Sequence, residues 1–98
     1  MRSAEGRVGG VPAPRISLLT KPGCHLCDDA RTALDAVLAE AGFAPHALAY
    51  DETDILQVPA LRDEYAEEIP VVLLDGRVHT IWRVEPDRLR TALRKALS

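Results

Sequence analysis

The chain of 98 residues has little of several features that define common protein classes. It carries only two cysteines, too few for the disulfide framework of a small secreted scaffold. No segment approaches the roughly 20 consecutive apolar residues that a membrane helix requires. Lysine and arginine number 12 against 15 aspartates and glutamates, so the basic face typical of nucleic-acid-binding proteins is not expected. We therefore expect neither nucleic acid nor a membrane as a partner.

The first part of the chain differs in composition from the rest. Residues 1–14 are rich in glycine, proline, alanine and arginine and show no apolar periodicity, which predicts a flexible tail. The tail has no apolar h-region, so we do not interpret it as a secretory signal and expect a cytoplasmic protein. Residues 15–98 then form one domain, because a length near 100 residues suits a single core. We expect this domain to be a monomer.

The apolar pattern of residues 15–98 predicts alternating strands and helices. Gly42 is expected to end the first helix, and Asp75-Gly76 is a strong signal for a two-residue hairpin turn. The order β-α-β-α-β-β-α predicts an α/β fold with a four-stranded mixed sheet flanked by helices on both faces. Strands are predicted at residues 15–20, 46–55, 69–74 and 77–82, and helices at residues 24–41, 59–66 and from 86 onward.

One motif carries chemistry, and it stands where the first strand gives way to the first helix. Cys24 lies where a helix leaves unpaired N–H groups and the positive end of its dipole, both of which favour a thiolate over a thiol. Cys27 lies one helical turn further on the same side, so it can attack a mixed disulfide formed on Cys24. Lys21 and His25 add positive charge near the pair. The full run is Lys21-Pro22-Gly23-Cys24-His25-Leu26-Cys27.

The two cysteines admit three simpler interpretations. A structural disulfide across so short a loop constrains the unfolded chain little. A zinc site commonly needs a second cysteine pair or two closely spaced histidines, whereas His46 and His79 are isolated. Two packed apolar cysteines fit poorly between Pro22-Gly23 and Asp28-Asp29. A redox-active dithiol is favoured, and a cluster or metal shared between two chains stays as the alternative.

The run around the cysteines, the element order and the Ile69-Pro70 step before the third strand resemble the glutaredoxin branch of the thioredoxin superfamily. The resemblance spans about residues 16–97. It is nearest to small bacterial glutaredoxin-like proteins with a Cys-His-Leu-Cys site. It implies a thioredoxin-like fold and a cis peptide bond at Pro70, facing the cysteines. It also implies that the backbone of Ile69 binds an extended substrate.

The same resemblance raises glutathione as a co-substrate. Lys21 matches a family lysine that pairs with a glutathione carboxylate. Glu68 and the Trp82-Arg83 pair depart from the family, which has threonine and two glycines at these places. Glycines permit close approach of a ligand to the backbone, and a tryptophan fills that space. No tightly bound cofactor is expected.

These observations predict a thiol–disulfide oxidoreductase in which Cys24 attacks and Cys27 resolves, with Lys21, His25, Ile69 and Pro70 binding substrate. Its partners would be protein disulfides or glutathione mixed disulfides. The alternative is a non-catalytic thioredoxin-fold module that binds a metal, an iron–sulfur cluster or a protein partner. Seven acids within residues 51–68 and six bases within residues 77–98 form two solvated faces of opposite sign, or else a docking surface.

Overall fold

The computed structural model describes residues 13–98, so the predicted tail lies almost wholly outside the described part. Pro14, its last residue, is buried. Two short 3-10 turns, Ala44–His46 and Ile55–Gln57, flank the second strand. The main elements are β1 (Ile16–Thr20), α1 (His25–Leu38), β2 (Tyr50–Asp54), α2 (Pro59–Tyr65), β3 (Val71–Leu74), β4 (Arg77–Ile81) and α3 (Pro86–Leu97).

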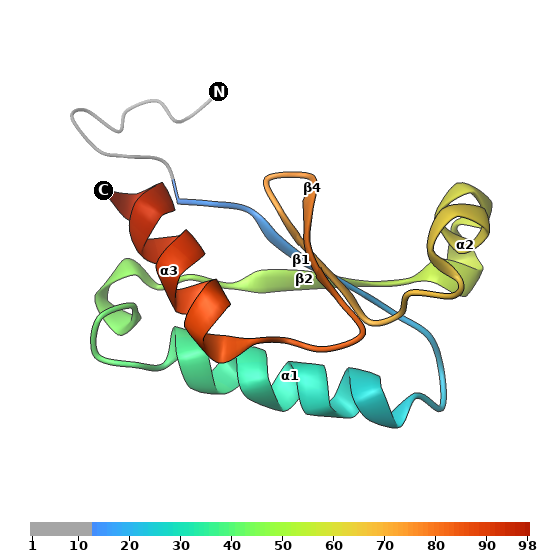
Figure 1. Ribbon diagram of the computed structural model, residues 1–98, viewed down its shortest axis with the longest axis horizontal. Coiled ribbons are helices and arrows are strands. Elements are labelled where there is room, and N and C mark those ends of the chain that lie inside the picture. The colour runs from blue at the N-terminus through green and yellow to red at the C-terminus, as the bar shows by residue number, and fades with distance from the viewer. Residues whose placement is uncertain (1–12) are drawn as a thin grey trace.

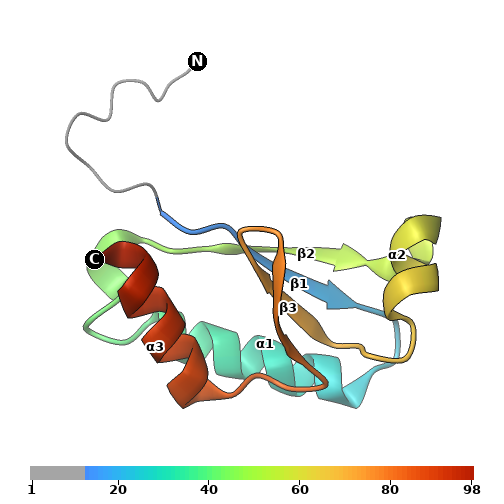
Figure 2. The same ribbon diagram turned by 45° about the horizontal axis from the view of Figure 1, so that its top comes forward.

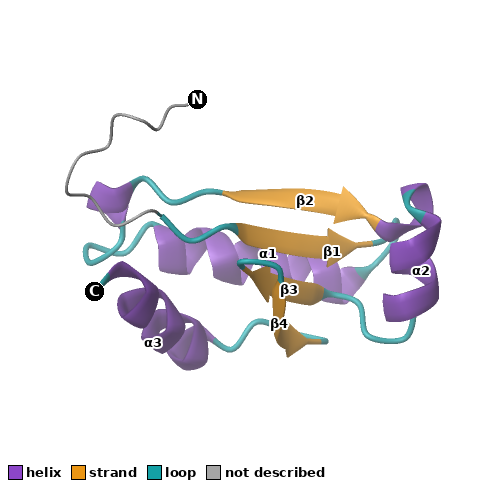
Figure 3. Cartoon of the chain, turned by 90° about the horizontal axis from the view of Figure 1, so that it is seen from above, coloured by secondary structure: helices purple, strands orange, loops and turns teal. Residues whose placement is uncertain are grey.

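The four strands form one mixed sheet in the order β2-β1-β3-β4, which confirms the predicted architecture (Figure 3). β1 and β2 are parallel, as a strand–helix–strand unit requires, and both other pairings are antiparallel. Asp75 and Gly76 both have positive φ, as the predicted two-residue hairpin between β3 and β4 needs. β4 is therefore an edge strand with a neighbour on one side only.

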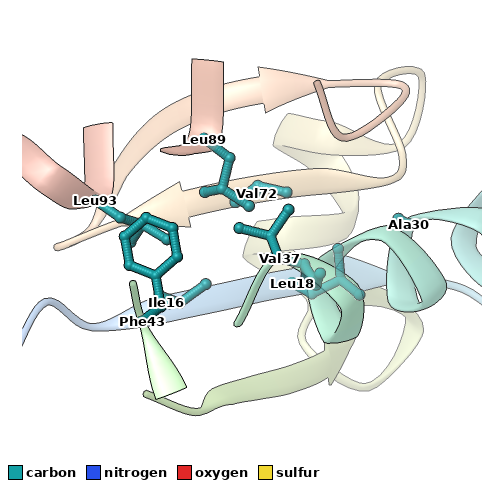
Figure 4. Packing of buried hydrophobic residues seen from close by; sticks show 9 residues of the cluster. Ile16, Leu18, Ala30, Val37, Phe43, Val72, Leu89 and Leu93 are labelled. Atoms are coloured by element: carbon teal, nitrogen blue, oxygen red, sulfur yellow. The ribbon is translucent and has the colours of Figure 1, made fainter. Parts of the chain in front are cut away.

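The larger core lies between one face of the sheet and helices α1 and α3, which pack together on that face (Figure 2). Apolar side chains from the sheet, from α1 and α3 and from Phe43 pack against one another there (Figure 4). Burying each leucine or isoleucine contributes about 1.5–3 kcal/mol, so this cluster carries much of the stability. Its members are Ile16, Leu18, Ala30, Leu34, Val37, Phe43, Val72, Leu89 and Leu93.

A second, smaller cluster lies at one end of the molecule and contains the cysteines. Cys27, Leu19, Ile55, Ile69 and Val71 are its buried members, and Cys24 packs against them. α2 stands at this end, on the side of the sheet opposite α1 (Figure 1). The carboxyl ends of β1 and β2 and the first turn of α1 meet here as well. The fold thus gathers segments distant in sequence around the cysteine pair.

Two sequence predictions of element boundaries were wrong. α1 ends at Leu38 rather than near Ala41, and Gly42 does not close it. Turns after Leu38, with Phe43 N–H donating to Glu40 O at 2.8 Å, bring Phe43 into the core, where it is 3% exposed. Residues 46–49 are not strand either, because Pro45 opens a 3-10 turn that Ala47 ends in the left-handed region at φ 52°. Within residues 13–98, no helix has the length and apolar character needed to cross a bilayer.

Candidate redox site

The first turn of α1 presents Cys24 at the helix N-terminus. Gly23 turns the chain after β1 with a φ of +69°, which few residues other than glycine adopt at low cost. Cys24 then takes the N-cap position with an extended backbone, and its Sγ accepts the N–H of Cys27 at 3.1 Å. The sulfur therefore occupies the place where a helix stabilises negative charge. Cys24 is half-buried, so a substrate sulfur can reach it.

Cys27 has a different environment although it lies only one turn away. Its side chain is 0% exposed and packs among the apolar residues of the smaller core cluster. Burial raises the pKa of the Cys27 thiol to about 11, and its hydrogen bond with Cys24 adds to this. A backbone hydrogen bond from Lys21 and the charge of Arg31 act in the opposite direction. Cys27 therefore stays a thiol under conditions in which an exposed cysteine begins to ionise.

The structure brings Ile69 and Pro70 to the cysteines. The peptide bond between them is cis, as the family resemblance implied. Ile69 is 6% exposed and belongs to the same cluster as both cysteines. Lys21 and His25 are exposed at this end, and none of the hydrogen bonds or ion pairs of residues 13–98 joins their side chains to a cysteine. Substrate binding by these four residues stays a prediction.

Sequence reasoning missed a set of paired polar groups next to Cys27, which we name the Arg31 network. Thr20 Oγ1 donates to Glu52 Oε2 at 3.1 Å, and Arg31 donates to both oxygens of Glu52 at 2.8 and 2.6 Å. Arg31 also pairs with Asp28 at 2.5 Å. The Arg31 guanidinium, and secondarily the Thr20 hydroxyl, hold the pKa of Glu52 below its usual range. The sequence predicts that Arg31, four residues after Cys27, lies on the same side of the helix as Cys27. The sequence gives no sign of the partner of Arg31 on β2.

Trp82 lies at this end of the molecule, immediately after β4, in an unusual conformation. It is 56% exposed and has a φ of +70°, a region that bulky residues rarely occupy. Its N–H donates to Pro70 O at 2.7 Å and its indole Nε1 donates to Glu67 O at 3.0 Å. The structure therefore holds a large apolar side chain in solvent beside the cis-proline.

A groove of about 640 Å³ begins at Leu26, inside the Cys-His-Leu-Cys run, and continues along β4 and the segment that leads to α3. We name it the Trp82 groove; Leu26, Val78, Thr80, Trp82, Arg83 and Arg88 are among the residues that line it. Four large apolar side chains of the described residues are exposed, and three of them, Leu26, Val78 and Trp82, line this groove. Together they form an apolar surface that extends from the first turn of α1 along β4.

The described part of the chain offers the cysteine pair no third metal-ligating side chain with which to form a metal site. Among residues 13–98, no three histidine, cysteine, aspartate or glutamate side chains gather as a metal ion would need. A metal or cluster on Cys24 and Cys27 would therefore require ligands from beyond these residues, such as a second chain or free thiols.

Comparison with known proteins places the chain among relatives of this fold. Residues 15–94 match a family described as a glutaredoxin-like domain. An uncharacterized protein of Mycobacterium tuberculosis is 36% identical over 83 residues, which cover 85% of this chain and 86% of the relative.

Solved structures agree with this placement. A structural-genomics target from X. campestris is 30% identical with a TM-score of 0.64, covering 82% of this chain and 96% of its own. Protein Ne2328 of Nitrosomonas europaea is 18% identical with a TM-score of 0.70, covering 85% and 94%. A thioredoxin mutant of Halobacterium salinarum is 14% identical with a TM-score of 0.58, covering 88% and 76%; it shows a shared thioredoxin fold.

Proposed function

The chain belongs to the glutaredoxin-like domain family, and we propose that it acts as a thiol–disulfide oxidoreductase. The observation that carries the proposal is the contrast between its two cysteines. Cys24 Sγ accepts an N–H at the start of a helix, whereas Cys27 lies buried one turn behind it. This arrangement provides an accessible nucleophile and a sheltered resolving thiol in one helical turn.

The reaction follows from these positions. The Cys24 thiolate attacks one sulfur of a substrate disulfide, so that a Cys24–substrate disulfide forms and the other substrate sulfur leaves as a thiolate. Cys27 then loses its proton and attacks the Cys24 sulfur, which releases the second substrate thiolate. The substrate gains two electrons, and the protein ends with a Cys24–Cys27 disulfide. An external thiol donor returns the protein to the dithiol, and glutathione is our candidate for this donor.

Cys27→Ser and Cys24→Ser variants test the proposal. We expect Cys27→Ser to accumulate a mixed disulfide with an oxidised protein substrate, because the first attack proceeds and the second cannot. Cys24→Ser is the matched control and should accumulate none. Mass spectrometry under non-reducing conditions measures the adduct. Equal adduct formation by both variants, or by neither, would contradict the proposal.

The reductant and substrate class are tested in a second experiment. Rates on a glutathione mixed disulfide and on a protein disulfide are compared under the same reducing system. Because Trp82 stands where glutaredoxins carry a close-approach glycine, we expect the protein disulfide to be the better substrate. A monomeric state and a cytoplasmic location stay predictions.

A further inference from the structure

We propose that the Trp82 groove binds the polypeptide segment next to the reacting cysteine of a protein substrate, and that it selects segments with an apolar side chain followed by a carboxylate. The inference rests on the proposed function, since it names the substrate class of the same cysteine pair. Three independent observations lead to it.

The first observation is the backbone of Trp82. A left-handed conformation is unfavourable for a non-glycine residue, and it is retained only where the surroundings hold it. Here the N–H bond to Pro70 O and the indole bond to Glu67 O provide that hold. The result is a tryptophan that is 56% exposed and fixed in orientation. A rigid, exposed aromatic side chain is typical of a binding anchor, because little entropy is lost when a partner covers it.

The second observation is the apolar surface around this anchor. Leu26 and Val78, 49% and 50% exposed, line the same groove as Trp82. Leu26 lies two residues beyond Cys24, and Trp82 hydrogen-bonds to the carbonyl of Pro70. Ile81, which packs against the cluster that contains the cysteines, lines the groove as well, so the groove borders the first turn of α1. An apolar side chain near a substrate cysteine would remove this surface from water.

The third observation concerns the polar atoms and charges of the groove. β4 has a strand neighbour on one side only, so the backbone N–H and C=O groups along its other edge are not engaged in strand pairing. β4 is an edge strand and can accept an extended segment beside it.

The charges of the groove favour a carboxylate. Arg88 has Glu85 at 3.8 Å, whereas no carboxylate of the described residues lies within 4.0 Å of Arg83. Glu85 lines the groove too, but it is the partner of Arg88, and Glu67 and Glu68 do not line the groove. A planar guanidinium without a partner binds a carboxylate through two hydrogen bonds. Beyond the apolar contact, Arg83 therefore favours an acidic side chain.

Peptide disulfides provide the test. Short peptides are linked through their cysteine to thionitrobenzoate, and Cys24 of the Cys27→Ser protein attacks the peptide sulfur. The new bond joins Cys24 to the peptide, and coloured thionitrobenzoate leaves with the electron pair. One peptide carries leucine and glutamate after the cysteine; others replace leucine by glycine or glutamate by lysine. We expect the leucine–glutamate peptide to react about tenfold faster than either replacement, the size of effect that follows the loss of one ordinary side-chain contact at an interface.

Variants then assign the preferences to residues. Trp82→Ala should abolish the preference for leucine, whereas Trp82→Phe should retain most of it. Arg83→Glu should reverse the preference to the lysine peptide. Arg77→Glu makes the same charge change at the far end of β4, outside the groove, and should leave both preferences unchanged. Thermal unfolding confirms that each variant is folded.

The outcomes separate this inference from the proposed function. Colour release at similar rates from all peptides would overturn the groove as a selective site while leaving Cys24 as a nucleophile. Equal effects of Arg83→Glu and Arg77→Glu would overturn the role of Arg83. No colour release from any peptide would contradict the proposed function itself, and the groove proposal with it.

Discussion

The two sides of the cysteine pair are built in opposite ways. On one side, the Arg31 network of Thr20, Asp28, Arg31 and Glu52 pairs its polar groups with one another. On the other side, the Trp82 groove exposes apolar side chains and contains Arg83, which has no carboxylate partner within 4.0 Å among the described residues. Groups that are already paired hold the fold together, and groups without partners are available to a substrate. The contrast suggests that one side positions Cys27 and the other receives what Cys24 attacks.

The largest expected effect concerns the two sulfurs between these sides. At about pH 8, a thiol with a pKa of about 11, such as Cys27, is ionised to only about 0.1%, and burial further limits its access to reagent. We expect iodoacetamide to label Cys24 at least about 100-fold faster than Cys27 in the reduced protein. Peptide mapping after short labelling times measures the ratio. Similar initial rates would remove the distinction between attacking and resolving thiols.

The next largest effect concerns the Arg31 network. Arg31→Met removes two hydrogen bonds to Glu52, so that the Thr20 hydroxyl is the one partner in the network that Glu52 retains. Hydrogen bonds to a charged group are worth more than neutral ones, but this pair is about one-third exposed. We therefore expect Arg31→Met to lower the free energy of unfolding modestly, and by more than Arg62→Met does. Urea denaturation measures it. Arg62→Met is the control, because its contact with Asp63 is 3.6 Å and more exposed.

The same pair predicts a pH dependence. Arg31 lowers the pKa of Glu52 from its usual 4.5 in the folded protein, so the unfolded chain takes up a proton first as the pH falls. The stability contributed by the pair is therefore fully present above about pH 5 and is lost as the pH falls below 4.5. We expect the stability difference between the wild type and Arg31→Met to shrink over this window. A difference independent of pH would indicate packing of the Arg31 stem instead.

The smallest effect on stability is expected in the Trp82 groove. Trp82→Gly relieves a left-handed backbone, a gain of about 1–2 kcal/mol, and loses the indole bond to Glu67 O, a cost of about 0.5–1.5 kcal/mol. We expect the free energy of unfolding to change by less than about 1 kcal/mol, while discrimination between the peptides is lost. A large destabilisation would show that Trp82 serves the fold rather than a substrate.

Features of the fold that depend on neighbouring residues could be predicted from the amino-acid sequence. A strand, a glycine turn and a helical period place Cys24 at a helix start and Cys27 one turn on, and the structure confirms both positions. Asp75-Gly76 determined its hairpin in the same way, since positive φ at both positions is a local requirement. The order of helices and strands along the chain was enough to predict a mixed four-stranded sheet.

Contacts between residues distant in the sequence could be seen only in the folded chain. Arg31 contacts Glu52 because β1 and β2 pair in parallel, and no spacing along the chain predicts that contact. Long-range packing of Phe43, rather than Gly42, decided where the first helix ends. Trp82 stays in solvent because the hydrogen bonds that it donates to the carbonyl oxygens of Pro70 and Glu67 hold its backbone and its ring. Local chemistry thus fixed the reactive sulfur, whereas contacts between remote segments built the surfaces on either side of it.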